Sequence, residues 1–235
     1  MFCIRIAGVT VGIENMYGYV EALCRDYIYN GSPDFCVIAS PCEIVAEQKA
    51  SKASVSAAYA ESACLCRKIC RELPKYKAFL FHSAAVECDG AVYAFFAPSG
   101  VGKSTHTSLW LKHFGDRARI INGDKPIFRF DGNRLLACGS PWCGKEGKNI
   151  NAEVPIRALC FIERGERNEI HRLSPAEAVE KILPQLLLPN TEPELDLLLS
   201  LTEKMLGLLP FYALRCTVSD EAVTLAYNTM NEVLP

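Results

Sequence analysis

Residues 91–111, AVYAFFAPSGVGKSTHTSLWL, combine an apolar run, a glycine-rich turn and a helical pattern. Ala91–Phe96 is typical of a buried strand, and Thr105–Lys112 is typical of an amphipathic helix. A glycine-rich turn between a strand and a helix can point several backbone N–H groups at one phosphate. This order of elements predicts an α/β domain built around a phosphate-binding loop.

The turn contains the groups that a nucleoside triphosphate needs. Lys103 can neutralise the phosphates, and the hydroxyl of Ser104 can hold Mg²⁺. Glycine permits the positive φ that turns successive amides inward. The predicted nucleotide-binding residues are Ser99, Gly100, Val101, Gly102, Lys103, Ser104 and Thr105.

One position departs from the pattern G-x-x-x-x-G-K-[ST]. Ala97 stands where the first glycine is expected. The alternative to a nucleotide site is an ordinary strand-to-helix turn, with Lys103 a solvated surface lysine. Because the turn lies between a strand and a helix, as a phosphate-binding loop requires, we favour nucleotide binding.

Composition limits the remaining functions. The chain has 235 residues, 50% of them hydrophobic and 22% charged, with a formal net charge of -2. These values suit one globular domain, or a core with a small appendage, and give no electrostatic reason to expect nucleic acid. The N-terminus lacks the apolar core of a signal peptide, and no apolar stretch is long enough to cross a bilayer. We therefore expect a cytoplasmic protein with neither nucleic acid nor membrane as a partner.

Twelve cysteines raise the question of a metal site. Cys64, Cys66 and Cys70 form the one cluster, but in a predicted helix their offsets point in different directions. Cys138 and Cys143 have no suitably spaced histidines. A zinc or iron–sulfur site is disfavoured, and reduced, mostly buried thiols are the expected state.

Two side chains outside the turn are candidate catalytic residues. Asp124 follows the predicted strand Ala118–Ile121 and is expected at its carboxyl end, beside the strand that leads into the turn, where phosphoryl-transfer enzymes place an acid. Its structural alternative is a turn aspartate before Pro126. His82 is expected on a strand next to Ala91–Phe96, either near the γ-phosphate or as a simple core histidine.

A glycine-rich loop is predicted over Gly139–Asn149. Lys145 could reach a phosphate or an acidic substrate group from this loop, and Trp142 could form a wall of the pocket. The alternative is a solvent-exposed loop whose lysines have no role.

We divide the chain into an N-terminal scaffold segment, residues 1–75, packed on a core formed by residues 76–235. Within the scaffold, Pro41 is expected to begin a loop. Within the core, Phe79–Cys88 is expected to be one strand, joined to the next by a hairpin at Asp89-Gly90. Glu169–Leu173 is expected to pair with the strand before it, Ile156–Glu163.

Four segments taken together resemble a known family. They are H-S-A-A-V at 82–86, A-P-S-G-V-G-K-S-T at 97–105, I-N-G-D-K-P at 121–126 and G-S-P-W-C-G-K at 139–145. In this order they resemble the HPr kinase/phosphorylase catalytic domain, and most closely the short HPr-kinase-like proteins, over about residues 76–232. The resemblance implies a P-loop fold of the phosphoenolpyruvate carboxykinase type.

The resemblance also implies roles for individual residues. Lys103 and the loop amides would bind the phosphates of ATP, Ser104 and Asp124 would hold Mg²⁺, and His82 matches the histidine that precedes the loop in HPr kinases. This chain has Gly123-Asp124 where that family has paired aspartates. It also has Thr105 in place of a glutamate, as in carboxykinases.

The predicted function is an ATP- and Mg²⁺-dependent kinase that transfers the γ-phosphoryl group to a serine-type hydroxyl of a protein, peptide or small molecule. Asp124, His82 and Lys103 are its predicted catalytic residues, assisted by Lys145. The alternative is a nucleotide-binding regulatory or accessory protein without turnover, which Ala97 and the single aspartate favour. GTP or pyrophosphate in place of ATP stays open, and the hexameric HPr kinases make self-association plausible.

Overall fold

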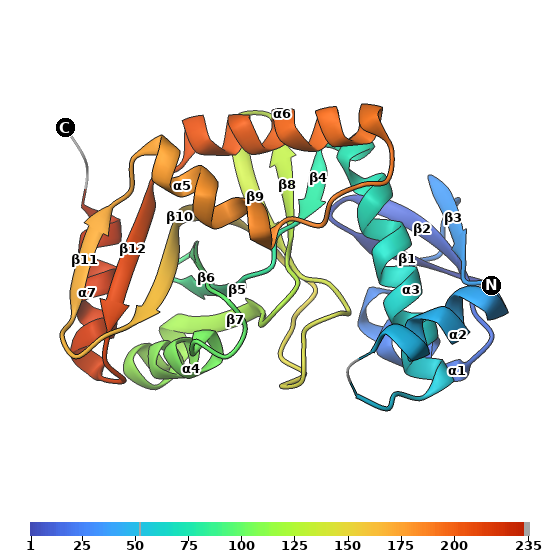
Figure 1. Cartoon of the computed structure of the whole chain (residues 1–235), viewed down its shortest axis with the longest axis horizontal. Coiled ribbons are helices and arrows are strands. Elements are labelled where there is room, and N and C mark those ends of the chain that lie inside the picture. The colour runs from blue at the N-terminus through green and yellow to red at the C-terminus, as the bar shows by residue number, and fades with distance from the viewer. Residues whose placement is uncertain (52, 233–235) are drawn as a thin grey trace.

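The computed structural model describes residues 1–51 and 53–232, which include a small sheet near the N-terminus and a large sheet beside it (Figure 1). In the small sheet, β1 (Phe2–Ile6) and β2 (Val9–Glu14) are antiparallel, and β3 (Phe35–Ile38) lies parallel to β2. Ala7 and Gly8 make the turn between β1 and β2 with φ of 49° and 75°. Positive φ at both positions is what a tight hairpin requires.

Three helices accompany the small sheet: α1 (Gly18–Leu23), α2 (Pro41–Ala50) and α3 (Ala57–Glu72). The expectation of a loop from Pro41 is wrong. Ser40 caps α2 by accepting from the N–H of Glu43, and the Glu43 side chain accepts in return from the backbone of Ser40. Proline at the first helical position lacks an N–H that would be unpaired there in any case, so it starts the helix.

Within the described residues, the large sheet has nine strands: β4 (Ala78–Leu80), β5 (Ala84–Cys88), β6 (Ala91–Phe96), β7 (Ala118–Asn122), β8 (Ile127–Asp131), β9 (Arg134–Cys138), β10 (Glu153–Arg164), β11 (Glu169–Arg172) and β12 (Phe211–Cys216). Seven follow the order β4-β8-β9-β10-β6-β5-β7, while β12 pairs with β10 and β11 with β12. The β10 pairs with β6 and β12 are parallel and the other pairs are antiparallel. An α/β fold with a mixed sheet is therefore confirmed.

Two strand expectations are wrong. The run Phe79–Cys88 is divided between β4, which pairs with β8, and β5, which pairs with β6 and β7. Between them the N–H groups of Phe81 and His82 donate to Pro126 and Gln185, outside the neighbouring strands. The second error concerns β11, which turns away from β10 and pairs with β12. The expected hairpin at Asp89-Gly90 is present, with φ of 53° and 81°.

Helices cover both faces of the large sheet (Figure 1). On one face α5 (Pro175–Ile182) and α6 (Glu192–Leu208) pack on a core that includes Phe81 and Phe96. On the other face α4 (Lys103–Phe114) and α7 (Asp220–Asn231) pack on a second core. Short 3-10 helices occupy Arg25–Tyr27, Leu73–Tyr76, Gly115–Arg117 and Leu183–Gln185.

The N-terminal elements share a hydrophobic core with the large sheet. Ile4 of β1 and Leu65 of α3 belong to the same buried cluster as Leu136 of β9 and Trp142. The indole N–H of Trp142 donates to the Ser62 hydroxyl of α3 at 3.0 Å. The two regions are thus packed together, while a boundary between residues 75 and 76 stays a prediction.

Most of the cysteines are buried, as expected. None of the twelve forms a disulfide in the structure, and nine of them are buried. Among the described helices, none is both long and apolar enough to cross a membrane.

Candidate functional site

Three strand ends meet at the predicted site. β5 runs antiparallel to both β6 and β7, with Ala84 opposite Phe95 and Ala85 opposite Asn122. The start of β5 therefore lies at the same edge as the ends of β6 and β7, which brings His82 and Asp124 to the end of the strand that leads into the glycine-rich turn. One detail of the prediction is wrong: β7 is not adjacent to β6, because β5 lies between them.

Residues 97–102, here called the glycine loop, connect β6 to α4. Gly100 and Gly102 have φ of 83° and 127°, values that residues with a side chain rarely adopt. A Cβ at either position would meet nothing within 4 Å, so conformation and not space requires glycine. No side chain caps α4 at Gly102. The first-turn N–H groups of a helix lack intrahelical partners, so the start of α4 can receive an anion.

Ala97 causes no distortion in this loop. It is fully buried and is not among the described non-glycine residues with positive φ. The backbone therefore accommodates alanine at this position without strain.

Lys103 begins α4 two residues earlier than expected, and its side chain folds back over the loop. Its ammonium group donates to the carbonyl of Ala97 at 3.1 Å. Burial lowers the pKa of Lys103, the charge of Asp124 raises it, and that of Lys125 lowers it, with a net decrease. Lys103 and Asp124 thus lie within electrostatic range of each other.

Asp124 lies between two basic side chains. His82 Nε2 is 3.0 Å from Asp124 Oδ1, and Lys125 donates to Oδ2 of the same carboxylate. Burial raises the pKa of Asp124, but the hydrogen bond from His82 and the charge of Lys125 outweigh it and hold the pKa well below its usual value. Burial lowers the pKa of Lys125, but the interactions with Asp124 raise it by more, so the net change is an increase. Asp124 is therefore ionised at neutral pH.

The buried side chain of Asn122 fixes this arrangement. Its Oδ1 accepts from the N–H groups of Asp124 and Lys125 at 2.9 and 2.7 Å. Its Nδ2 donates to the carbonyls of Ser140 and Trp142. Asn122 thus joins the end of β7 to the 139–149 loop and holds the backbone of Asp124 in place.

The 139–149 loop returns to the site at its tip. A Cβ on Gly144 would lie 2.9 Å from the Cβ of Asp124, so the chain passes directly against that residue. Two residues further on, hydrogen bonds from Ser104 and Lys148 lower the pKa of Glu146. Lys145 lies between them and is exposed, and its contact with a phosphate stays a prediction. Trp142 is buried against α3 and forms no wall of the site.

Arg164, at the end of β10, supports the glycine loop through hydrogen bonds to its backbone. Its guanidinium donates to the carbonyls of Val101 and Gly100 at 2.9 and 2.7 Å. Beside this contact lies a cavity of about 410 Å³ that is continuous with the loop. Its lining includes Gly102, Thr105, Leu109, Ile162, Arg164 and Thr217.

The described residues contain no group of three or more His, Cys, Asp or Glu side chains that could hold a metal ion by themselves. Mg²⁺ is usually held by one or two carboxylates, with water and substrate phosphates completing its shell. Asp124 and Glu146 carry carboxylates and Ser104 carries a hydroxyl, which are residue types that can hold Mg²⁺ together with a bound nucleotide.

Four residues of this site were not predicted: Asn122, Lys125, Glu146 and Arg164. Asn122 and Lys125 flank Asp124 within I-N-G-D-K-P, so that motif could have indicated both. Nothing in the local sequence of Glu146 or Arg164 distinguishes them from surface charges, because loop closure and strand pairing bring them to the site.

No family model matches the chain, and no curated protein sequence matches it. Among solved structures, it is similar to the HPr(Ser) kinase/phosphatase from Coxiella burnetii, with 9% sequence identity and a TM-score of 0.38. The similarity covers 65% of this chain and 99% of the other. At these values it assigns neither a family nor an activity.

Proposed function

We propose that the protein is an ATP- and Mg²⁺-dependent kinase that transfers the γ-phosphoryl group to a serine-type hydroxyl of a protein, peptide or small molecule. It would be an HPr-kinase-like enzyme with a P-loop fold of the carboxykinase type. The observation that carries the proposal is the position of Asp124, ionised and paired with His82 where β6 delivers the glycine loop and Lys103.

In this proposal the glycine loop and the first turn of α4 hold the phosphates. The uncapped amides of α4 and the ammonium group of Lys103 face the same anion. The nucleoside would extend into the cavity that Thr105 and Leu109 line on the other side of the loop. Arg164 would keep the loop in its binding shape through the two carbonyls to which it donates.

Asp124 would orient the acceptor hydroxyl. A carboxylate with so low a pKa is a weak base, so it would take the proton only as the new O–P bond forms, which suits a loose phosphoryl-transfer transition state. His82 would keep one carboxylate oxygen oriented. Mg²⁺, held by Ser104, Asp124 and Glu146, would neutralise charge on the transferred group, with Glu146 serving where the family has a second aspartate.

A second function, nucleotide binding without turnover, is favoured by one observation. Both oxygens of Asp124 already have basic partners, His82 and Lys125, so an acceptor hydroxyl must displace or share one of them. Turnover separates the two functions.

The test incubates the protein with Mg²⁺ and γ-labelled ATP, alone and with free serine, HPr or a pool of serine-containing peptides. A kinase labels an acceptor, and Lys103→Ala abolishes the label. Asp124→Asn should lower turnover at least about 100-fold while nucleotide still binds. Lys112→Ala, an exposed lysine in the last turn of the same helix, is the matched control and should be unchanged. Binding without labelling would support the second function, and full activity of Asp124→Asn would refute the role given to Asp124.

A further inference from the structure

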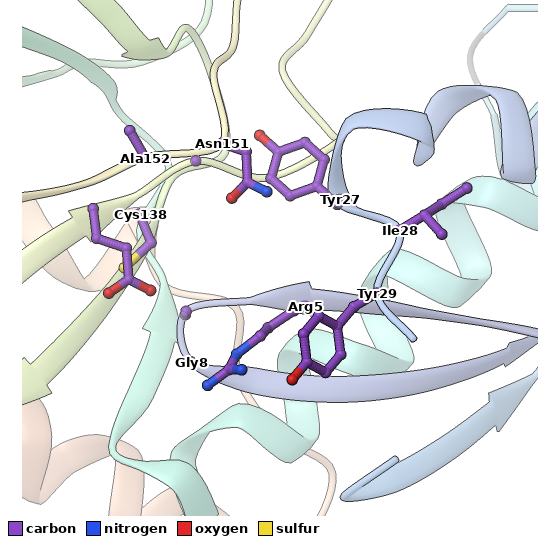
Figure 2. A pocket seen from close by; sticks show the side chains of 11 residues that line it. Arg5, Gly8, Tyr27, Ile28, Tyr29, Cys138, Asn151 and Ala152 are labelled. Carbon is purple, nitrogen blue, oxygen red and sulfur yellow. The ribbon is translucent and has the colours of Figure 1, made fainter. Parts of the chain in front are cut away.

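A second cavity, of about 320 Å³, lies between the small sheet and the large sheet (Figure 2). The turn between β1 and β2, residues 27–29, the end of β9 and the start of β10 all contribute to its lining. Figure 2 shows Tyr27 and Asn151 on one side of the opening, with Arg5 and Tyr29 facing them across it. The cavity shares no lining residue with the glycine loop, and Gly139 is the one residue of the 139–149 loop in its lining.

The cavity has a cationic side without an anionic partner. Arg5 projects from β1, and its guanidinium carbon lies 5.0 Å from the centre of the Tyr29 ring. Within residues 1–51 and 53–232, Arg5 forms no ion pair. The stacked ring holds the guanidinium in place and leaves its N–H donors for a carboxylate, which a guanidinium can bind through two parallel hydrogen bonds.

Hydrogen-bond acceptors lie on the opposite side. The side-chain amide of Asn151 donates to the carbonyl of Asp26 at 2.9 Å, which fixes the amide and leaves its oxygen free to accept. Glu153 forms an ion pair with Arg129 at 2.6 Å through one carboxylate oxygen, so its charge is already paired, but its other oxygen can still accept a hydrogen bond. An ammonium group with three donors suits this pair of acceptors.

We propose that this cavity binds a free α-amino acid. Arg5 binds its carboxylate, and Asn151 and Glu153 accept from its ammonium group. A zwitterion matches the two sides with no net change in charge, whereas a simple anion leaves the acceptor side unpaired. The volume is at the lower end of the usual range for small-molecule sites, about 300 to 1,000 Å³, which suits a ligand of this size.

The test is calorimetric titration of the whole protein, without nucleotide, with each of the twenty amino acids and with acetate and methylamine as probes that carry one charge each. At least one amino acid should bind with a Kd below about 1 mM, and both single-charge probes should bind at least about tenfold more weakly. If no amino acid binds at 10 mM, or if acetate binds as tightly as the best amino acid, the proposal is refuted. Because nucleotide is absent, the result is independent of the proposed kinase activity.

Variants locate the site. Arg5→Met keeps an unbranched side chain over Tyr29 and should weaken amino-acid binding at least about tenfold. Arg25→Met, an exposed arginine of the same region outside the cavity, is the matched control. Glu153→Gln should weaken binding of the amino acid but not of acetate. If Arg5→Met is unfolded by circular dichroism, Glu153→Gln decides alone, and unchanged amino-acid affinity in that variant refutes the proposal.

Discussion

The middle and the start of helix α4 are held in opposite ways. In the middle, the buried Trp110 packs against Tyr93, with ring centroids 4.9 Å apart, and donates to His106 Nε2 at 3.0 Å. At the start, no side chain caps the helix, and open space surrounds the positions where Gly100 and Gly102 lack a Cβ. The difference shows that packing of the middle holds the helix in place, so its first-turn amides can remain unpaired and available to an anion.

Removing Trp110, which anchors the middle of α4, should cause the largest loss of stability. Trp110→Ala deletes a fully buried side chain and should lower the free energy of unfolding by about 3–5 kcal/mol, because the cavity cannot collapse completely. Urea denaturation measures this loss. Ser108→Ala, on the exposed side of the same helix, should change stability by no more than about 0.5 kcal/mol. Similar values for the two variants would show that the middle of α4 is not the anchor.

Acid should weaken the same anchor. Burial lowers the pKa of His106 to about 4, whereas a histidine in the unfolded chain has a pKa of about 6.5. Below pH 6.5 the unfolded chain therefore binds a proton that the folded chain does not, so stability falls as the pH falls, until the folded pKa is reached. Between pH 7.5 and pH 5 the loss should be about 2 kcal/mol.

Denaturation curves at several pH values test this expectation, and His106→Gln should flatten the pH dependence in this window. The low pKa of Asp124 also makes acid destabilising, but only below the unfolded value of aspartate, near about 4, so it does not affect this window. An unchanged pH dependence in His106→Gln would mean that another group titrates.

The smallest expected change in stability comes from comparing a glycine of the glycine loop with a glycine of an ordinary hairpin turn. Gly100 and Gly90 have φ of 83° and 81°, and a Cβ at either position would meet nothing within 4 Å. Alanine at either position should therefore lower the free energy of unfolding by the same amount, about 1 kcal/mol, because of backbone strain. Titration with ATP should distinguish them, because only Gly100→Ala disturbs the proposed phosphate contacts. Equal ATP affinity in the two variants would refute the role of the glycine loop.

Patterns that depend on neighbouring residues could be predicted from the sequence. The Asp89-Gly90 hairpin and the strand, loop and helix around Lys103 are both present. Local chemistry decides each of them: positive φ at a turn, or an apolar run before glycines.

Features that depend on distant residues could not be predicted. Phe79–Cys88 is apolar throughout, so nothing within it marks the break before His82, where the chain bonds to Pro126 and Gln185. The pairing of β11 with β12 joins segments about 40 residues apart, whereas a hairpin with β10 would have been local. In the site, Asp124 and His82 could be predicted because their motifs are local, but the approach of Glu146 depends on how the whole 139–149 loop folds.

Strand β10 acts as a rigid spacer between the two cavities. It begins at Glu153, which lines the cavity beside Arg5, and ends at Arg164, which holds the glycine loop. Its 12 residues span roughly 35 Å along the strand at about 3.3 Å per residue. Neighbours β9, β6 and β12 bond to it along this length. A ligand in the cavity at one end therefore cannot touch a ligand at the glycine loop at the other end, and the two positions do not compete for space.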